Sequence, residues 1–135
     1  MHADAAAPDA STLKPAGPNE PDWVRHAIAW HVFPLGAVGA PALCPPGDPD
    51  DASSPAGAMA AEHRLRRLIP WLDRLIELGC NVLMLGPVFH SMSHGYDTVD
   101  HMRVDPRLGT NEDLLALIDA AHTRGVRVML DGVFN

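Results

Sequence analysis

The sequence has few basic residues and few cysteines, and both shortages exclude classes of function. Lysine and arginine total 10 against 17 aspartates and glutamates, which gives a formal net charge of −7 at pH 7. A protein that binds nucleic acid needs clustered lysine and arginine to neutralise phosphates, so nucleic acid is not an expected partner. The two cysteines, Cys44 and Cys80, form no CxxC pair, and we expect free thiols in a reducing compartment.

The sequence also lacks the segments that mark membrane, secreted and nucleotide-binding proteins. No run reaches the roughly 18 uncharged apolar residues of a membrane span, so a membrane is not an expected partner. No basic region followed by an apolar core opens the chain, which predicts no secretory signal and a cytoplasmic location. Neither GxGxxG nor a GxxxxGKS or GxxxxGKT loop occurs, which disfavours an α/β nucleotide-binding protein.

The composition divides the chain into a tail and one folded part. Residues 1–22 are rich in Ala, Pro, Asp and Ser and offer too little apolar surface to order themselves, so we predict a disordered tail. Residues 23–135 carry the apolar patterns of a globular domain, and 47% of the whole chain is hydrophobic, a usual value for such proteins.

Three apolar runs alternate with two helical patterns in the folded part. The runs at 27–33, 81–89 and 126–134 predict strands, and the second is nearly continuous, as in a strand buried on both faces. Leucines and isoleucines at three- and four-residue spacing predict a helix over 60–78. A second helix over 110–125 opens on Thr-x-x-Asp, which resembles a capping box, and ends at a glycine.

One residue conflicts with the first helix. Pro70 either kinks it or lies in the first turn of a helix that begins near Leu68. Long polar segments at 36–57 and 90–109 read as loops. The resulting order is a parallel βαβαβ unit with its site at the carboxyl ends of the strands, and both a doubly wound sheet and a barrel segment satisfy it.

Three short motifs after the strands narrow this choice. They are H-G-Y-D at 94–97, D-P-x-L-G-T at 105–110 and D-G-V-F-N at 131–135. Together and in this order they resemble the α-amylase family of glycoside hydrolases (glycoside hydrolase family 13). The segment A-W-H-V-F-P at 29–34 is similar to the first barrel strand of that family, with Trp30 where tyrosine is usual.

The resemblance implies the N-terminal βαβαβ portion of a (β/α)₈ TIM barrel, a fold of about 250 residues that the 135 residues cannot complete. It implies a retaining glycosidase or transglycosidase acting on α-glucosidic bonds of oligo- or polysaccharides. In retaining enzymes a carboxylate nucleophile and an acid/base lie about 5–5.5 Å apart. In this family they follow later strands, so no catalytic residue is assigned here, and both would lie beyond Asn135.

Five residues of the chain match family site positions. Tyr96 matches the aromatic residue that stacks on a sugar ring, and Asp97 matches an aspartate that binds hydroxyls of a terminal glucose. Asp131 and His94 match residues that support the site. The resemblance implies no obligatory cofactor, and Asn135 matches a position that binds Ca²⁺ in some members.

Other polar residues in the same loops are expected to be structural. We expect this of Asp105, and we expect Arg103 and Arg107 to form loop salt bridges. The spacing of His90, His94 and His101 fits no standard structural zinc site. A stand-alone, non-catalytic remnant or weak carbohydrate-binding module is the alternative to a barrel fragment, although three strands alone would leave an open sheet edge.

Overall fold

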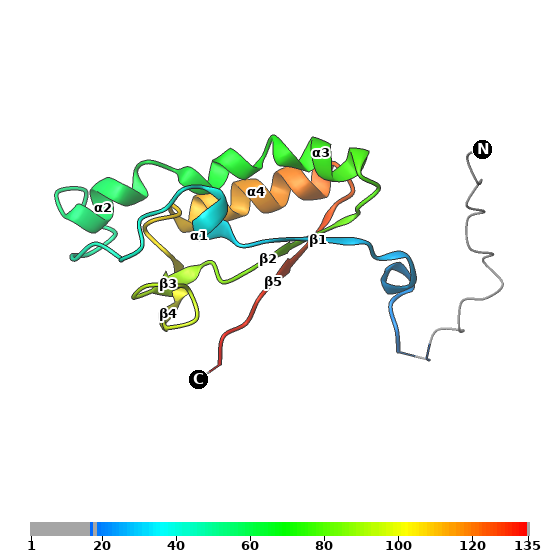
Figure 1. Ribbon diagram of the computed structural model, residues 1–135, viewed down its shortest axis with the longest axis horizontal. Helices are drawn as coiled ribbons and strands as arrows, with labels where there is room; N and C mark the ends of the chain where they lie inside the picture. Colours follow the sequence, from blue (N-terminus) through cyan, green and yellow to red (C-terminus); the bar gives the residue numbers. More distant parts are fainter. Residues whose placement is uncertain (1–16, 18, 135) are drawn as a thin grey trace, which may run out of the picture.

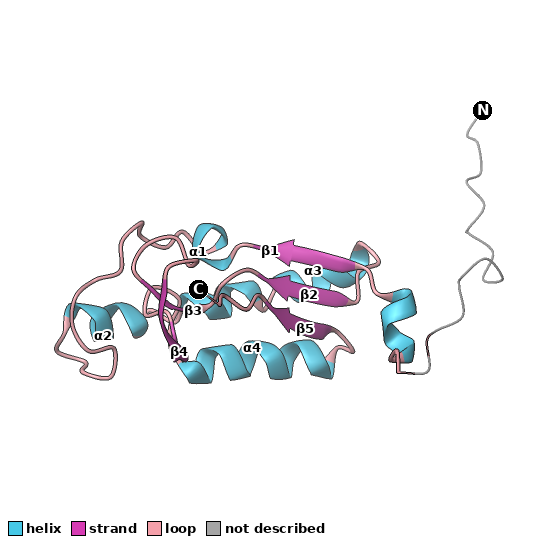
Figure 2. Ribbon diagram, turned by 90° about the horizontal axis from the view of Figure 1, so that it is seen from below, coloured by secondary structure: helices cyan, strands magenta, loops and turns pink. Residues whose placement is uncertain are grey.

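The computed structural model describes residue 17 and residues 19–134, and a three-stranded parallel sheet lies at its centre. The strands β1 (Ala29–Val32), β2 (Val82–Leu85) and β5 (Arg127–Leu130) pair in the order β1-β2-β5. In Figure 2 the three arrowheads point toward the long loops, so the carboxyl ends of the strands and those loops share one end of the sheet. The predicted βαβαβ order is confirmed.

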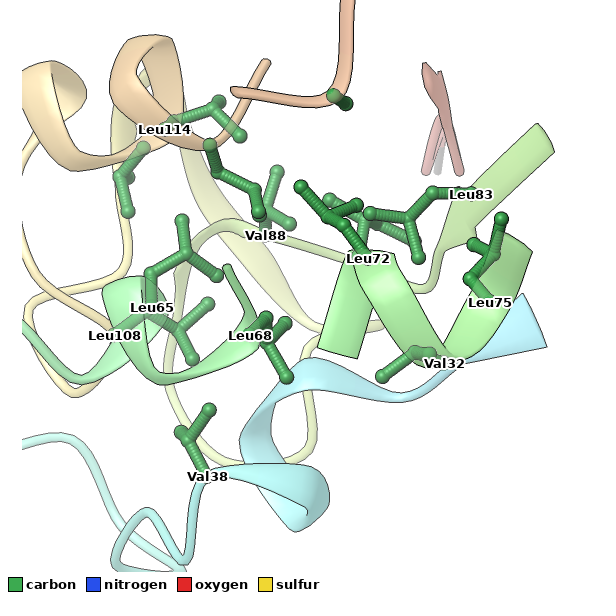
Figure 3. Close-up of a cluster of buried hydrophobic side chains, with 14 of the residues drawn as sticks. Val32, Val38, Leu65, Leu68, Leu72, Leu75, Leu83, Val88, Leu108 and Leu114 are labelled. Atoms are coloured by element: carbon green, nitrogen blue, oxygen red, sulfur yellow. The ribbon is translucent and has the colours of Figure 1, made fainter. Parts of the chain in front are cut away.

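One face of the sheet is covered by helices α3 (Trp71–Glu77) and α4 (Asn111–Thr123), which lie side by side above the strands (Figure 1). Leu83 of β2 stands in register between Trp30 and Val128, and all three pack into the hydrophobic core on this face. Figure 3 shows the leucines and valines that fill the space between strands and helices. The buried members include Val32, Leu65, Leu68, Leu72, Leu75, Leu83, Leu85, Val88, Leu108, Leu114 and Leu117.

The prediction of one helix over 60–78 is wrong. The segment contains the last residue of α2 (Pro55–Ala60), the 3₁₀ helix η3 (Arg64–Leu68) and α3. His63 adopts the left-handed backbone conformation, with φ 49°, which ends the first helical stretch before η3 begins. Pro70 is the N-cap of α3, because a residue without an N–H is tolerated at the start of a helix and not in its interior.

The predicted start of the second helix is confirmed as a capping box. The Thr110 side chain accepts a hydrogen bond from the Asp113 N–H, and the Asp113 carboxylate accepts one from the Thr110 N–H at 2.9 Å. Asp113 also bonds to Arg66 and, at 2.8 Å, to His63, which ties α4 to the residues around η3. Gly125 follows the helix with φ +74°, a conformation that favours glycine.

The two segments that were predicted to be loops, 36–57 and 90–109, contain regular structure. The first holds the short α1 (Pro34–Ala37) and the start of α2. The second holds an antiparallel pair, β3 (Phe89–Ser91) and β4 (Thr98–Val104), which projects beyond the carboxyl ends of the parallel strands. This hairpin was missed because most residues of β4 are exposed or half-buried, so no alternation of apolar and polar residues marks it.

The opposite end of the sheet meets the 3₁₀ helix η2 (Asp22–His26). The Asn81 side chain accepts a hydrogen bond from the Ile28 N–H and donates one to the His26 carbonyl, each at 2.8 Å. Most of the predicted tail over 1–22 lies outside the described residues, and the first described helix begins at Asp22, one residue before the predicted boundary.

Both cysteines are free thiols, as predicted. Among the helices of the described residues, none has the length and apolar character needed to cross a membrane.

Candidate functional site

The candidate site lies at the carboxyl ends of the parallel strands, where the loop after β3 meets the residue that follows β5. The loop supplies His94, Tyr96 and Asp97, and Asp131 comes directly after β5. Gly95, within this loop, has φ +93°, and a Cβ there would lie 3.0 Å from the Pro87 side chain. Glycine is therefore required at this turn for both its backbone conformation and its close approach to Pro87.

The centre of the site is a hydrogen bond between two predicted site residues that are distant in sequence. The Tyr96 hydroxyl donates to Oδ2 of Asp131 at 2.9 Å. This bond and the negative charge of Asp131 raise the pKa of Tyr96, because both favour the protonated phenol. Tyr96 is 47% exposed.

His94 supports the same tyrosine from within the loop. Its Nδ1 accepts a hydrogen bond from the Tyr96 N–H at 3.2 Å, and the two rings lie 6.3 Å apart at a tilt of 32°. The structure thus places His94 in contact with Tyr96.

Asp97 is held by a residue that the sequence analysis did not identify. Ser93 donates two hydrogen bonds to the Asp97 carboxylate, from its Oγ to Oδ2 at 2.6 Å and from its N–H to Oδ1 at 3.1 Å. The Ser93 hydroxyl is the main reason that the pKa of Asp97 falls to about 2. The S-x-x-x-D spacing within a glycine-containing loop is the one signal that could have identified Ser93.

A hollow of about 440 Å³ lies beside His94. Its walls come from the segment after β1 and from the loop that carries the site, and they include Phe33 and the largely exposed Leu43. A second hollow of about 280 Å³, between β4 and the start of α4, contains none of the predicted site residues.

The residues predicted to be structural do form ion pairs. Arg103 binds Asp48 at 3.0 Å and Asp50 at 2.9 Å, which ties the segment before α2 to β4. Arg107 binds Asp105 at 2.8 Å, and both side chains are fully or almost fully buried. These pairs confirm the predicted loop salt bridges.

The structure does not test the predicted Ca²⁺ contact, because Asn135 lies outside the described residues. Within the described part of the chain, no group of three His, Cys, Asp or Glu side chains could hold a metal ion. His90 lies 3.4 Å from the sulfur of Cys44, and His101 bonds to the Val133 carbonyl at 2.6 Å.

The arrangement suits the binding of a polyhydroxylated ligand. An exposed aromatic face can cover the C–H face of a sugar ring, and the ionised carboxylate of Asp97 can accept hydrogen bonds from hydroxyl groups. Asp131 is engaged by Tyr96 and fixes the tyrosine hydroxyl.

Comparison with known proteins finds a matching family model and related sequences. A family model for the alpha amylase catalytic domain matches residues 60–135. A cyclomaltodextrinase of Geobacillus thermopakistaniensis is 39% identical over 118 residues, which cover 85% of this chain and 20% of the relative. An intracellular maltogenic amylase of Bacillus subtilis is 36% identical over 118 residues, with the same coverage of both chains.

A solved structure has a similar fold over most of this chain. The debranching enzyme of Nostoc punctiforme superposes with a TM-score of 0.61 at 34% identity, over 85% of this chain and 25% of that one. The chain thus spans about a fifth of the length of the curated relatives it matches.

Proposed function

Because this chain belongs to the α-amylase family of catalytic domains, we propose that it forms the N-terminal part of the barrel of a retaining glycoside hydrolase or transglycosidase acting on α-glucosidic bonds. One observation carries the proposal. Tyr96 and Asp131, from two separate family motifs, meet in a hydrogen bond at the carboxyl end of the sheet, and Asp97 follows Tyr96 in the chain. In barrels of this class the active site occupies that end.

Each site residue has a defined role in the proposal. The Tyr96 ring stacks on a glucose ring, and the hydrogen bond to Asp131 fixes the position and tilt of the Tyr96 ring. Asp97, with its lowered pKa, is ionised at neutral pH and accepts hydrogen bonds from sugar hydroxyls. His94 supports the loop through the Tyr96 N–H.

The bond-breaking groups would follow later strands, beyond Asn135. A carboxylate nucleophile there would attack the anomeric carbon while a carboxylic acid protonates the leaving oxygen. The residue that gave up this proton would then act as the base that activates water or an acceptor hydroxyl. The residues of this chain would bind and orient the sugar on which that pair acts. No step in this proposal requires a metal ion, and Ca²⁺ at Asn135 stays a prediction.

The proposed substrates are α-glucans and α-glucosides. The names of the matched proteins point to cyclic maltodextrins, maltose-releasing cleavage and debranching. Asp97 favours substrates that present a terminal glucose. We also propose a cytoplasmic location, which the name of the intracellular maltogenic amylase supports.

The test uses the full-length product of the reading frame that encodes these residues. We expect cleavage of soluble starch, pullulan or a cyclic maltodextrin, with the α-anomer released first in ¹H NMR. The Tyr96→Ala and Asp97→Ala variants should lose about tenfold or more in kcat/KM, since each removes a direct substrate contact. Met102→Ala is the matched control, because Met102 is 81% exposed and lies outside the site.

Two results would contradict the proposal. One is a full-length product without the carboxylate pair and without activity on any α-glucan. The other is an active enzyme in which Tyr96→Ala and Asp97→Ala behave like Met102→Ala.

A further inference from the structure

A buried cation lies directly behind the candidate site. The Arg107 side chain has no solvent exposure, and its partner Asp105 is only 1% exposed. Burying a charge is costly even when it is paired, and an apolar pair of similar volume is often as stable. A buried ion pair is therefore weak evidence for stability, and its significance depends on the other groups that it contacts.

Those contacts extend to strand β3 and to the segment after β1. Asp105 accepts hydrogen bonds from the Arg107 Nε and Nη2, each at 2.8 Å, and from the N–H and Oγ of Ser91, each at 3.0 Å. Arg107 also donates to the Ser91 Oγ at 2.8 Å. From Nη1 it donates to carbonyls of the segment after β1, those of Pro41 and Ala42.

The same nitrogen reaches the residue that holds Asp97. Nη1 of Arg107 donates a hydrogen bond to the Ser93 carbonyl. Ser93 in turn binds both carboxylate oxygens of Asp97 through its N–H and its Oγ. A continuous series of hydrogen bonds therefore runs from the buried ion pair through Ser93 to Asp97, the residue predicted to bind sugar hydroxyls.

We infer that Arg107 and Ser93 are positioning residues, which fix the orientation of the Asp97 carboxylate toward the substrate. Only the planar, five-donor guanidinium can hold a carboxylate on one edge and backbone carbonyls on the other, so lysine cannot replace it. Neither residue needs to touch the sugar. The inference rests on the proposed function for the part of it that concerns substrate binding.

Ser93→Ala and Ser93→Thr in the full-length protein test this inference. Alanine removes the Oγ bond to Asp97 and keeps the backbone contacts, whereas threonine keeps the hydroxyl. We expect Ser93→Ala to raise KM for maltotriose about fivefold to tenfold with kcat within about twofold, since a misplaced ligand group weakens binding. Ser93→Thr should restore most of the wild-type KM.

A double-mutant cycle separates positioning from general structural support. In an Asp97→Ala background, Ser93→Ala and Arg107→Lys should raise KM no further, because the group that they orient is absent. If either substitution raises KM equally in both backgrounds, that residue does not act through Asp97 and the inference is overturned for it.

A readout without activity keeps the inference independent of the proposed function. In crystal structures of the full-length Ser93→Ala and Arg107→Lys variants, we expect the Asp97 carboxylate to leave its wild-type position. A carboxylate that stays in place in both overturns the inference, whether or not the protein cleaves α-glucans. Should Arg107→Lys fail to fold, Ser93→Ala alone decides the result. A wild-type protein that is inactive on α-glucans contradicts only the proposed function.

Discussion

At the scale of single residues, the site depends on one long-range pair and one local pair. Tyr96 and Asp131 are 35 residues apart and meet only because β5 ends where the loop after β3 folds back. Ser93 and Asp97 are four residues apart and meet within one loop. The long-range pair therefore depends on correct strand order, whereas the local pair depends on the turn at Gly95.

The long-range pair leads to a prediction for Tyr96→Phe. The substitution keeps the aromatic face and removes only the hydroxyl that donates to Asp131. We expect KM for a short maltooligosaccharide to rise about fivefold, the ratio that corresponds to one net hydrogen bond, while Tyr96→Ala has a larger effect. Steady-state kinetics on the full-length protein measure this. Equal effects of Phe and Ala would show that the ring face contributes nothing.

The local pair leads to a prediction on pH. The pKa of Asp97 is about 2, below the ordinary aspartate value. The hydrogen bonds to its carboxylate therefore stabilise the fold at pH values above about 4, and this stabilisation is lost as the pH falls from about 4 to about 2. A carboxyl ¹³C NMR titration should give a midpoint near 2 in the wild type and one closer to the ordinary value in Ser93→Ala. An unchanged midpoint would mean that Ser93 does not set the pKa of Asp97.

The sequence predicted the candidate site residues but not the groups that hold them. Tyr96, Asp97 and Asp131 follow from the family motifs. Ser93 lies outside these motifs, and its role depends on the path of the loop. Arg107 was predicted to form a salt bridge, but its complete burial and its carbonyl contacts require three segments to converge, which no local pattern encodes.

At the scale of elements, apolar periodicity predicted the core better than it predicted the helices. Four leucines of the segment 60–78 are buried in the core as expected, although the backbone is broken by the left-handed residue His63 and by Pro70; they are Leu65, Leu68, Leu72 and Leu75. Leu78 of the same segment is 55% exposed. Periodicity reports which side chains are buried, and a 3₁₀ turn followed by an α-helix can bury nearly the same set. The strands β1, β2 and β5 could be predicted because each contributes apolar side chains to the core on the helix-covered face, which makes its sequence an apolar run.

The capping box of α4 gives a prediction on stability. Thr110→Ala should lower the free energy of unfolding by about 1 kcal/mol, whereas Thr110→Ser should have little effect because serine caps equally well. Asp113→Ala should cost about 2 kcal/mol, since it also removes the bonds to Arg66 and His63. Urea unfolding of the full-length protein measures both values.

A larger cost for Thr110→Ala than for Asp113→Ala would contradict the assignment of Asp113 as the centre of this cluster. Burial acts to raise the pKa of Asp113, but the bonds from Arg66, His63 and Thr110 outweigh it and leave the pKa lowered. Its stabilising effect should therefore be present at neutral pH and be lost in acid, as the carboxylate becomes protonated.

At the scale of the whole molecule, the two faces of the sheet differ. The face toward α3 and α4 is filled by the core, whereas His31, Met84 and Met129 stand in register on the other face. His31 is exposed and Met129 is 43% exposed. In a closed barrel this second face points to the interior, where side chains from the other strands cover it.

This asymmetry predicts how a polypeptide of residues 1–135 behaves when it is made alone. Uncovered apolar side chains and the outer edges of β1 and β5, which pair with no further strand in the described part of the chain, should drive self-association. The average mass in sedimentation equilibrium should therefore rise with concentration. Met129→Lys should reduce the association by placing a charge on the uncovered face. Leu115→Lys is the matched control, because Leu115 is 59% exposed on the outer side of α4. A monomer with a sharp, cooperative unfolding transition would instead support a stand-alone carbohydrate-binding module, because these strands would then be stable without the rest of a barrel.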